Sequence, residues 1–374
     1  MKRYYYPAAF VFLLLVIGCG KTYRLDRFPK IPAPEWQYTR GDLQSSGQIE
    51  SNYRGGLNPK WRGKFGDSPV GPLTFGAGNV IVPSSREKAY FFDPVTGKNR
   101  GRVKTKGNAQ TGLMIVDSLA YFSGGYDENY FKCLNLHTLG TSWKVSIKDV
   151  TGAPIILEDR VYLASTTGKV ECRNRLTGDI IWQTQASSRS PAGPSVFGNR
   201  VYFPLDNGVL TAFDTETGEM IFESDLEEPL MAKVAVGGMV FVTGAEGSFW
   251  AVDKETGETI WRRQFDWPIW TAPAVDENMV YFGDNGGFLR ALDKKTGRTV
   301  WEFQSDGIIL ASPIVVGNYL LFASLDRYLY SLEKKSGLLN SKWKSDHEIR
   351  FSPISDGESI YVATFGGVIQ CLGD

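Results

Sequence analysis

One nine-residue phrase recurs along this chain and constrains its fold more than any other feature. "DKETGETIW" at 253–261 returns as "DKKTGRTVW" at 293–301. Weaker copies begin at Asp93, Asn135, Asn174, Asp214, Glu333 and Gly373, and successive copies are 39 to 42 residues apart. A fixed period of this length indicates a repeat architecture, in which one structural unit is stacked many times.

Each repeat reads as four short strands. Alternating apolar residues, as in "NRVYFP" at 199–204, are separated by glycine-bearing turns such as Asp206-Asn207-Gly208. This pattern predicts antiparallel hairpins. Four strands in about forty residues make one blade of a β-propeller. The sequence therefore predicts an all-β fold, a single eight-bladed β-propeller of four-stranded antiparallel blades over residues 36–374.

The aromatic residue that closes the phrase is predicted to hold neighbouring blades together. The Asp or Asn can cap its own turn, the Gly can adopt a left-handed backbone conformation, and the ring can cover the junction between two sheets. We expect this blade-docking role for Trp61, Trp143, Trp182, Phe222, Trp261, Trp301 and Trp343. Gly101 occupies the slot that should hold an aromatic residue in another repeat.

The two ends of the repeat region predict how the ring closes. The last repeat stops after three strands, and Trp61 stands in a strand that no blade precedes. We expect this N-terminal strand to become the outer strand of the eighth blade. A seven-bladed ring is the alternative, because the repeats around Gly101 and Trp143 depart most from the pattern.

The N-terminus carries a targeting signal. Residues 1–18 place Lys2 and Arg3 before an apolar run that is too short to span a bilayer, as in a secretory signal peptide. "VIGC" at 16–19 resembles the bacterial lipoprotein box, which implies that Cys19 is lipidated. The proline-bearing stretch 19–35 is expected to form an extended tether. We expect a lipid anchor in the outer membrane, with the propeller on its periplasmic face; a single transmembrane anchor is the alternative.

The phrase D-x-x-T-G-x-x-x-W resembles the tryptophan-docking repeat of the quinoprotein (PQQ) propeller superfamily, and "WQYTRGDLQSSG" at 36–47 resembles its N-terminal lead-in. A single-propeller lipoprotein of this size is most similar to the BamB family of outer-membrane β-barrel assembly lipoproteins. The resemblance implies a non-catalytic scaffold that binds the barrel-assembly protein, through its periplasmic domains, and other assembly lipoproteins. The alternatives are a PQQ- or small-ligand-binding propeller and a scaffold of another envelope complex.

Residues that could carry out catalysis are scarce. His137 and His347 stand apart from any ligand cluster, and no C-x-x-C-H haem motif is present. Cys133, Cys172 and Cys371 share one slot of the repeat, where we expect small buried side chains. We therefore expect no catalytic residue, no metal site and no cofactor. The 41 basic and 41 acidic residues predict no nucleic-acid partner.

The family resemblance also implies where a partner binds. Its partner surface is built from neighbouring loops between blades, with an arginine in one loop and acidic residues in the next. At the matching places this chain has Arg189 in "SSRSPAGP", and Glu227 and Glu228 in "DLEEPL". The following loop, "FDWPIWTAP", adds Trp267, which we expect to be exposed, and Trp270, which we expect to line the ring.

Overall fold

The computed structural model describes residues 40–105, 109, 111–124 and 129–374. The predicted signal peptide (1–18), the lipidated Cys19, the tether (19–35) and the start of the lead-in lie outside these residues. Every regular element among the described residues is a β strand. That part of the chain contains no helix that is long and apolar enough to cross a membrane.

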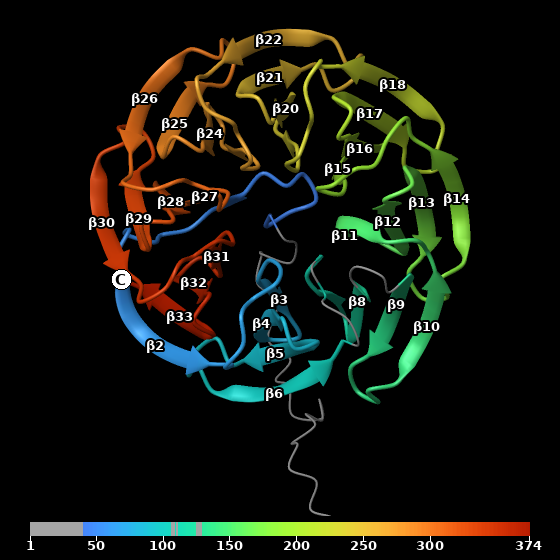
Figure 1. Ribbon diagram of the computed structural model, residues 1–374, viewed down its shortest axis with the longest axis horizontal. Coiled ribbons are helices and arrows are strands. Elements are labelled where there is room, and N and C mark those ends of the chain that lie inside the picture. The colour runs from blue at the N-terminus through green and yellow to red at the C-terminus, as the bar shows by residue number, and fades with distance from the viewer. Residues whose placement is uncertain (1–39, 106–108, 110, 125–128) are drawn as a thin grey trace, which may run out of the picture.

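Eight sheets are arranged around a central axis in Figure 1, and we number them as blades 1 to 8. Blade 1 contains β3 (Thr74–Gly76), β4 (Asn79–Ser84), β5 (Lys88–Phe92) and β6 (Asn99–Lys104), and blade 2 contains β7 (Met114–Val116), β8 (Leu119–Ser123), β9 (Tyr130–Asn135) and β10 (Thr141–Ser146). Blade 3 contains β11 (Val150–Leu157), β12 (Arg160–Ser165), β13 (Lys169–Asn174) and β14 (Ile180–Gln185), and blade 4 contains β15 (Ser195–Phe197), β16 (Arg200–Pro204), β17 (Val209–Asp214) and β18 (Met220–Asp225).

Blades 5 to 8 repeat the arrangement. Blade 5 contains β19 (Ala235–Val236), β20 (Val240–Thr243), β21 (Ser248–Val252) and β22 (Thr259–Gln264), and blade 6 contains β23 (Ala274–Val275), β24 (Met279–Gly283), β25 (Phe288–Asp293) and β26 (Thr299–Gln304). Blade 7 contains β27 (Ile314–Val316), β28 (Tyr319–Ala323), β29 (Tyr328–Glu333) and β30 (Leu339–Lys344), and blade 8 contains β31 (Ile354–Ser355), β32 (Ser359–Thr364), β33 (Val368–Gly373) and β2 (Asn58–Lys64). The predicted eight-bladed propeller is confirmed.

The repeated phrase forms the turn between the third and fourth strands of a blade. In blade 5, Asp253 Oδ1 accepts hydrogen bonds from the backbone N–H groups of Glu255 and Thr256, at 2.8 and 2.9 Å. These bonds lower the pKa of the Asp253 carboxyl. Gly257 closes the turn with a φ of 79°, in the left-handed region that glycine adopts at little cost. The phrase is therefore a local turn device that each blade repeats.

The ring at the end of the phrase docks on the next blade. The indole Nε1 of Trp182 in blade 3 donates to the carbonyl oxygen of Thr215 in the turn of blade 4, at 2.9 Å. The same bond, at 2.8 to 3.1 Å, joins Trp61 to Pro94, Trp143 to Arg175, Trp261 to Lys294, and Trp301 to Lys334. Phe222, which has no N–H, lies against Gly257 of blade 5.

Trp343 departs from this series, and the prediction that it docks blade 7 is wrong. Ser331 pairs with Ser341, whereas Trp343 pairs with Leu329, two residues further along β30. Ser341 thus occupies the docking slot. Tyr53, from the N-terminal segment, is buried beside this slot in the same cluster as Leu321. Tyr53 also makes an edge-to-face contact with Tyr319, with ring centroids 5.9 Å apart, and so places an aromatic ring beside the docking slot that Ser341 occupies.

The N-terminal strand closes the ring, as predicted. β2 is antiparallel to β33, with Trp61 opposite Cys371. The Asp374 carboxylate accepts hydrogen bonds from the backbone N–H groups of Arg54 and Gly56, both at 2.8 Å. Figure 1 shows the C-terminus beside the start of β2. The seven-bladed alternative is wrong, because the repeats that contain Gly101 and Trp143 both form complete four-stranded sheets.

A feature that the sequence did not predict is a segment that crosses the central channel. Residues 40–49, the channel segment, pass the inner strands of blades 4 to 7 and end in β1 (Gln48–Ile49), which is parallel to β27. The backbone N–H groups of Val196, Val236, Val275 and Val315 donate to the carbonyl oxygens of Leu43, Gln44, Ser46 and Gly47, at 2.7 to 3.0 Å. Four blades are thereby tied to one strand of backbone.

Arg40 fixes the start of the channel segment. Its guanidinium donates to the carbonyl oxygens of Pro313 at 2.9 Å and Pro273 at 2.7 Å, and the side chain is buried. A Cβ added at Gly47, where φ is 66°, would lie 2.4 Å from Arg40 Nη2. The "RGD…G" lead-in is therefore a structural feature of the channel.

Candidate protein-interaction site

The predicted partner residues lie on one rim of the ring. The loops between blades and the turns between second and third strands meet at this end of the strands, which we call the loop rim. The turn at 205–208 joins two of the predicted loops: Asp206 N donates to the Arg189 carbonyl oxygen at 3.0 Å, and Leu226 N donates to the Gly208 carbonyl oxygen at 2.9 Å. The loops of Arg189 and Glu227 are therefore packed on a common turn.

Arg189 forms an ion pair with Asp206 and its side chain is 44% exposed. Ser188 Oγ donates to the other oxygen of the same carboxylate at 2.5 Å. Ser188 therefore helps to hold Asp206 in place. Arg189 consequently presents a fixed, half-exposed guanidinium at the rim.

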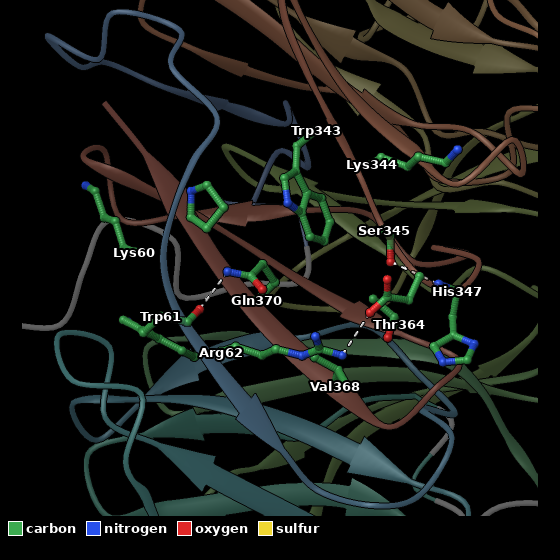
Figure 2. A pocket seen from close by; sticks show the side chains of 12 residues that line it. Lys60, Trp61, Arg62, Trp343, Lys344, Ser345, His347, Thr364, Val368 and Gln370 are labelled. Carbon is green, nitrogen blue, oxygen red and sulfur yellow. Dashed lines mark hydrogen bonds and ion pairs between the residues drawn. The ribbon is translucent and has the colours of Figure 1, made fainter.

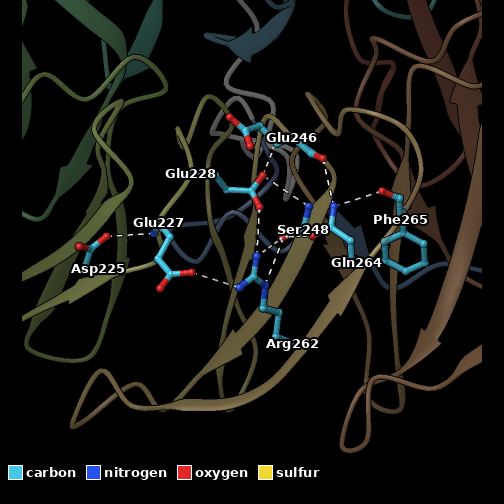
Figure 3. A network of polar contacts seen from close by, with 8 residues as sticks. All are labelled: Asp225, Glu227, Glu228, Glu246, Ser248, Arg262, Gln264 and Phe265. Carbon is cyan, nitrogen blue, oxygen red and sulfur yellow. Dashed lines mark hydrogen bonds and ion pairs between the residues drawn. The ribbon is translucent and has the colours of Figure 1, made fainter.

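Glu227 and Glu228 are adjacent in sequence but have different environments (Figure 3). The Glu227 side chain is 75% exposed and lies 3.4 Å from the Arg262 guanidinium. Glu228 is 5% exposed, and its Oε2 accepts a hydrogen bond from Glu246 N at 2.7 Å. The prediction that Glu228 offers its carboxylate to a partner is therefore corrected, because that carboxylate caps the 244–248 turn of blade 5.

The two tryptophans of the next loop also differ. Trp267 is 47% exposed and covers the turn of blade 6, where a Cβ added at Gly286 would lie 2.3 Å from its ring. Trp270 is 51% exposed and lines a cavity in the central channel, as the sequence predicted. Trp267 is thus exposed on the loop that follows the loop of Glu227, whereas Trp270 faces the axis.

A groove lies between the outer strands of blades 7 and 8, β30 and β2 (Figure 2). Its volume is about 440 Å³, and Trp61, Trp343, Lys60, Arg62 and His347 are among the residues that line it. Arg62 is paired with Asp346 at 3.1 Å. Sequence analysis missed this groove because it depends on the displacement of Trp343 from the docking slot.

The central cavity, of about 220 Å³, opens at the loop rim and was also missed. Arg40, Lys233 and Trp270 are among its lining residues. Lys233 is only 7% exposed, and its burial lowers the pKa of its ammonium group to about 7, an effect to which Arg40 adds. The available signal was the sequence "MAKVAV" at 231–236, which places a lysine where the neighbouring repeats have the glycine of "PAGPSV" at 191–196 and Ala272 of "WTAPAV" at 270–275.

The cysteines and histidines form no reactive cluster in the described part of the chain. Cys133, Cys172 and Cys371 are free and buried. Burial raises the pKa of the Cys172 thiol to about 12 and that of Cys371 to about 11. No three His, Cys, Asp or Glu side chains among the described residues are placed to hold a metal ion. The thiols therefore pack as small apolar groups.

Comparison with known proteins identifies the family. A family model described as outer membrane protein assembly factor BamB matches residues 59–184 and 167–372. Among curated proteins, the outer membrane protein assembly factor BamB of Bordetella pertussis (strain Tohama I) is 27% identical over 146 residues, which cover 36% of this chain and 37% of that protein. The match thus spans little more than a third of that relative's length.

Solved structures share the fold. BamB from Moraxella catarrhalis superposes with a TM-score of 0.72 at 17% identity, covering 85% of this chain and all of that one. A europium-containing methanol dehydrogenase gives 0.71 at 14% identity, covering 91% of both chains. A quinohaemoprotein alcohol dehydrogenase from Comamonas testosteroni gives 0.75 at 12% identity, covering 91% of this chain and 80% of that one. These likenesses indicate the fold alone, but the family model matches almost the whole propeller, and this chain belongs to the outer membrane protein assembly factor BamB family.

Proposed function

We propose that this protein is a non-catalytic scaffold in the assembly of outer-membrane β-barrel proteins, and that it binds a protein partner through the loop rim of blades 4 to 6. One observation carries the proposal. Arg189, Glu227 and Trp267 come from three consecutive loops between blades and are all substantially exposed. Each stands on a loop that is bonded to a neighbouring turn.

This surface has the properties of a recognition site. It combines a guanidinium, a carboxylate and an indole, groups that give an interface charge complementarity and an aromatic anchor. Loops held by a rigid scaffold lose little conformational freedom on binding. The buried Glu228 carboxylate contributes rigidity, because it joins the loop that carries Glu227 to the turn of blade 5 and to Arg262, 3.7 Å away.

The location follows the same reasoning. Family membership supports a place at the outer membrane, and the lipoprotein box at 16–19 supports lipidation of Cys19 with the propeller on the periplasmic face. In this arrangement the partners are the barrel-assembly protein, through its periplasmic domains, and other assembly lipoproteins.

In-cell photocrosslinking tests the proposal. A photoreactive residue is placed at Arg189 or Glu227, and at Lys295 as the control, because Lys295 is exposed in a turn at the opposite ends of the strands. We expect both loop-rim positions, but not position 295, to capture the periplasmic domains of the barrel-assembly protein. Capture of a different envelope protein at both loop-rim positions, or equal capture from position 295, would reject this assignment.

A PQQ-dependent enzyme is the second candidate, since the methanol and alcohol dehydrogenases share the fold. Such an enzyme would need oxygen ligands for Ca²⁺ in the central channel. Among the described residues, the channel segment contributes the carboxylate of Asp42. This carboxylate already accepts hydrogen bonds from Ser46 N and Oγ. These residues do not fit a calcium-held cofactor. Reduction of a dye by the protein with PQQ and Ca²⁺ would favour the enzyme over the scaffold.

A further inference from the structure

Lys233 occupies a slot that neighbouring blades fill with small residues. The backbone bonds to the channel segment align blades 4 to 7 at Val196, Val236, Val275 and Val315. Three residues before these positions stand Gly193, Lys233, Ala272 and Ser312. The fold thus requires only a small side chain here. The repeat itself therefore does not explain why blade 5 has a lysine at this position.

Lys233 is a buried residue that lines the cavity, and its ammonium group has no ion-pair partner among the described residues. The residue is 7% exposed, and neither an ion pair nor a hydrogen bond joins its ammonium group to the residues that the structure describes. Asp42 acts on it only through its charge, since the Asp42 carboxylate is bonded to Ser46. Removing an unpaired cation from water is costly, and the cost is offset when an anion binds beside it.

The surroundings indicate what kind of anion fits. The cavity holds about 220 Å³, the room of roughly seven waters at about 30 Å³ each. Trp270 and Met231 give it an apolar wall, and Ser312 and Ser352 add hydroxyl groups. The Arg40 guanidinium donates through Nη1 and Nη2 to the backbone carbonyl oxygens of Ala272, Pro273 and Pro313, and its Nε, which has no partner among the described residues, is buried.

One available cation, hydroxyl groups and an aromatic wall match a monoanion with a small apolar body. A phosphate dianion is held best by the paired N–H groups of a free guanidinium or by more than one cation. We propose that the central cavity binds a small organic carboxylate, with its carboxylate against the Lys233 ammonium group and its apolar part against Trp270. This site is separate from the surface formed by Arg189, Glu227 and Trp267.

Fluorine NMR with the full mature chain tests the site. The probe is 4-fluorobenzoate, and 4-fluorobenzylamine is its cationic counterpart. We expect line broadening with 4-fluorobenzoate only. Lys233→Met should weaken 4-fluorobenzoate binding at least tenfold, whereas Lys295→Met should leave it unchanged. Because Lys233→Met removes a buried charge, we expect it to fold.

A second pair of variants tests the apolar wall. Trp270→Ala should weaken 4-fluorobenzoate binding severalfold, whereas Trp267→Ala, which removes an equally exposed indole outside the cavity, should not. Absence of 4-fluorobenzoate binding to the unmodified chain, equal binding of the amine, or unchanged affinity in Lys233→Met would each overturn the proposal. Tighter binding of inorganic phosphate would overturn the assignment to a carboxylate.

Discussion

Gly218 of blade 4 lies directly against the indole of Trp182 of blade 3: a Cβ added at Gly218 would be 2.5 Å from Trp182 Cδ2. The glycine of the repeated phrase therefore has two roles. It adopts a φ of 73°, and it leaves the space that the preceding blade's ring fills. The same contact joins Gly97 to Trp61, Gly178 to Trp143, Gly297 to Trp261 and Gly337 to Trp301.

Substitution of this glycine should separate its two roles. Gly198 has a φ of 58° and nothing within 4 Å of an added Cβ, so Gly198→Ala introduces backbone strain alone and should cost about 1 kcal/mol. Gly218→Ala adds a clash with Trp182 and should cost about 2 kcal/mol more. Denaturant unfolding of both variants measures the difference. Equal losses would mean that docking tolerates a methyl group at this contact.

The sequence could predict most of this fold because the interactions that define a blade are local. The turn caps, the strand alternation and the docking ring all lie within about forty residues of one another. One exception follows the same logic. In blade 1, Gly101 occupies the slot that holds a docking ring in other blades, and it pairs with Phe91 on the neighbouring strand. In blade 2, Leu139 replaces the glycine of the phrase and packs on the cluster that contains Phe91.

Features that depend on distant parts of the chain could not be predicted. Tyr53 reaches a slot beside Ser331, and the channel segment reaches Lys233, across more than 150 residues of sequence. Glu227 has a φ of 69° in the turn where its side chain is exposed and that of the adjacent Glu228 is buried. Residue type alone does not determine such an angle.

The two glutamates should respond differently to loss of charge. Glu228→Gln should lower the free energy of unfolding by about 1–3 kcal/mol. The substitution removes the negative charge that accepts the hydrogen bond from Glu246 N and that pairs with the Arg262 guanidinium. Glu227→Gln should change it by less than about 0.5 kcal/mol. In the crosslinking experiment, a Glu227→Gln background should reduce capture from position 189. A larger stability loss at Glu227 would contradict the environments described here.

Trp343 should matter less for stability than the tryptophans that dock. Trp261→Ala should cost about 3–5 kcal/mol, because it empties a buried site and removes the bond to the Lys294 carbonyl oxygen. Trp343→Ala should cost less than half of that, since the ring is partly exposed in the groove of Figure 2. Unfolding midpoints of the two variants provide the comparison, and similar losses would restore a docking role for Trp343.

The buried thiols should be protected by the fold. In a Cys19→Ser variant, three cysteines remain. Because burial raises the pKa values of Cys133, Cys172 and Cys371, their thiolate populations at pH 8 are small, and the strands around them block access. We expect no reaction with Ellman's reagent in the folded protein and three reactive thiols in guanidinium. Rapid labelling of the folded protein would indicate an exposed thiol.

Lys233 should make stability depend on pH in a direction that can be tested. Its pKa is about 7 in the folded protein and about 10.4 in an unfolded chain, so between these values the unfolded state binds the extra proton. The Lys233 contribution to the free energy of unfolding therefore rises as the pH rises from about 7 to about 10.4, and below pH 7 its unfavourable effect is complete.

Comparison with Lys233→Met isolates this contribution from other titrating groups. The variant should be more stable than the unmodified chain by a few kcal/mol at pH 6, and the difference should shrink towards pH 10. Lys295→Met, which removes an exposed charge, should show no such trend. Unfolding free energies measured at pH 6, 8 and 10 test this. A saturating carboxylate should reduce the difference at pH 6, because it binds more tightly to the chain that retains the Lys233 ammonium group and stabilises its folded state.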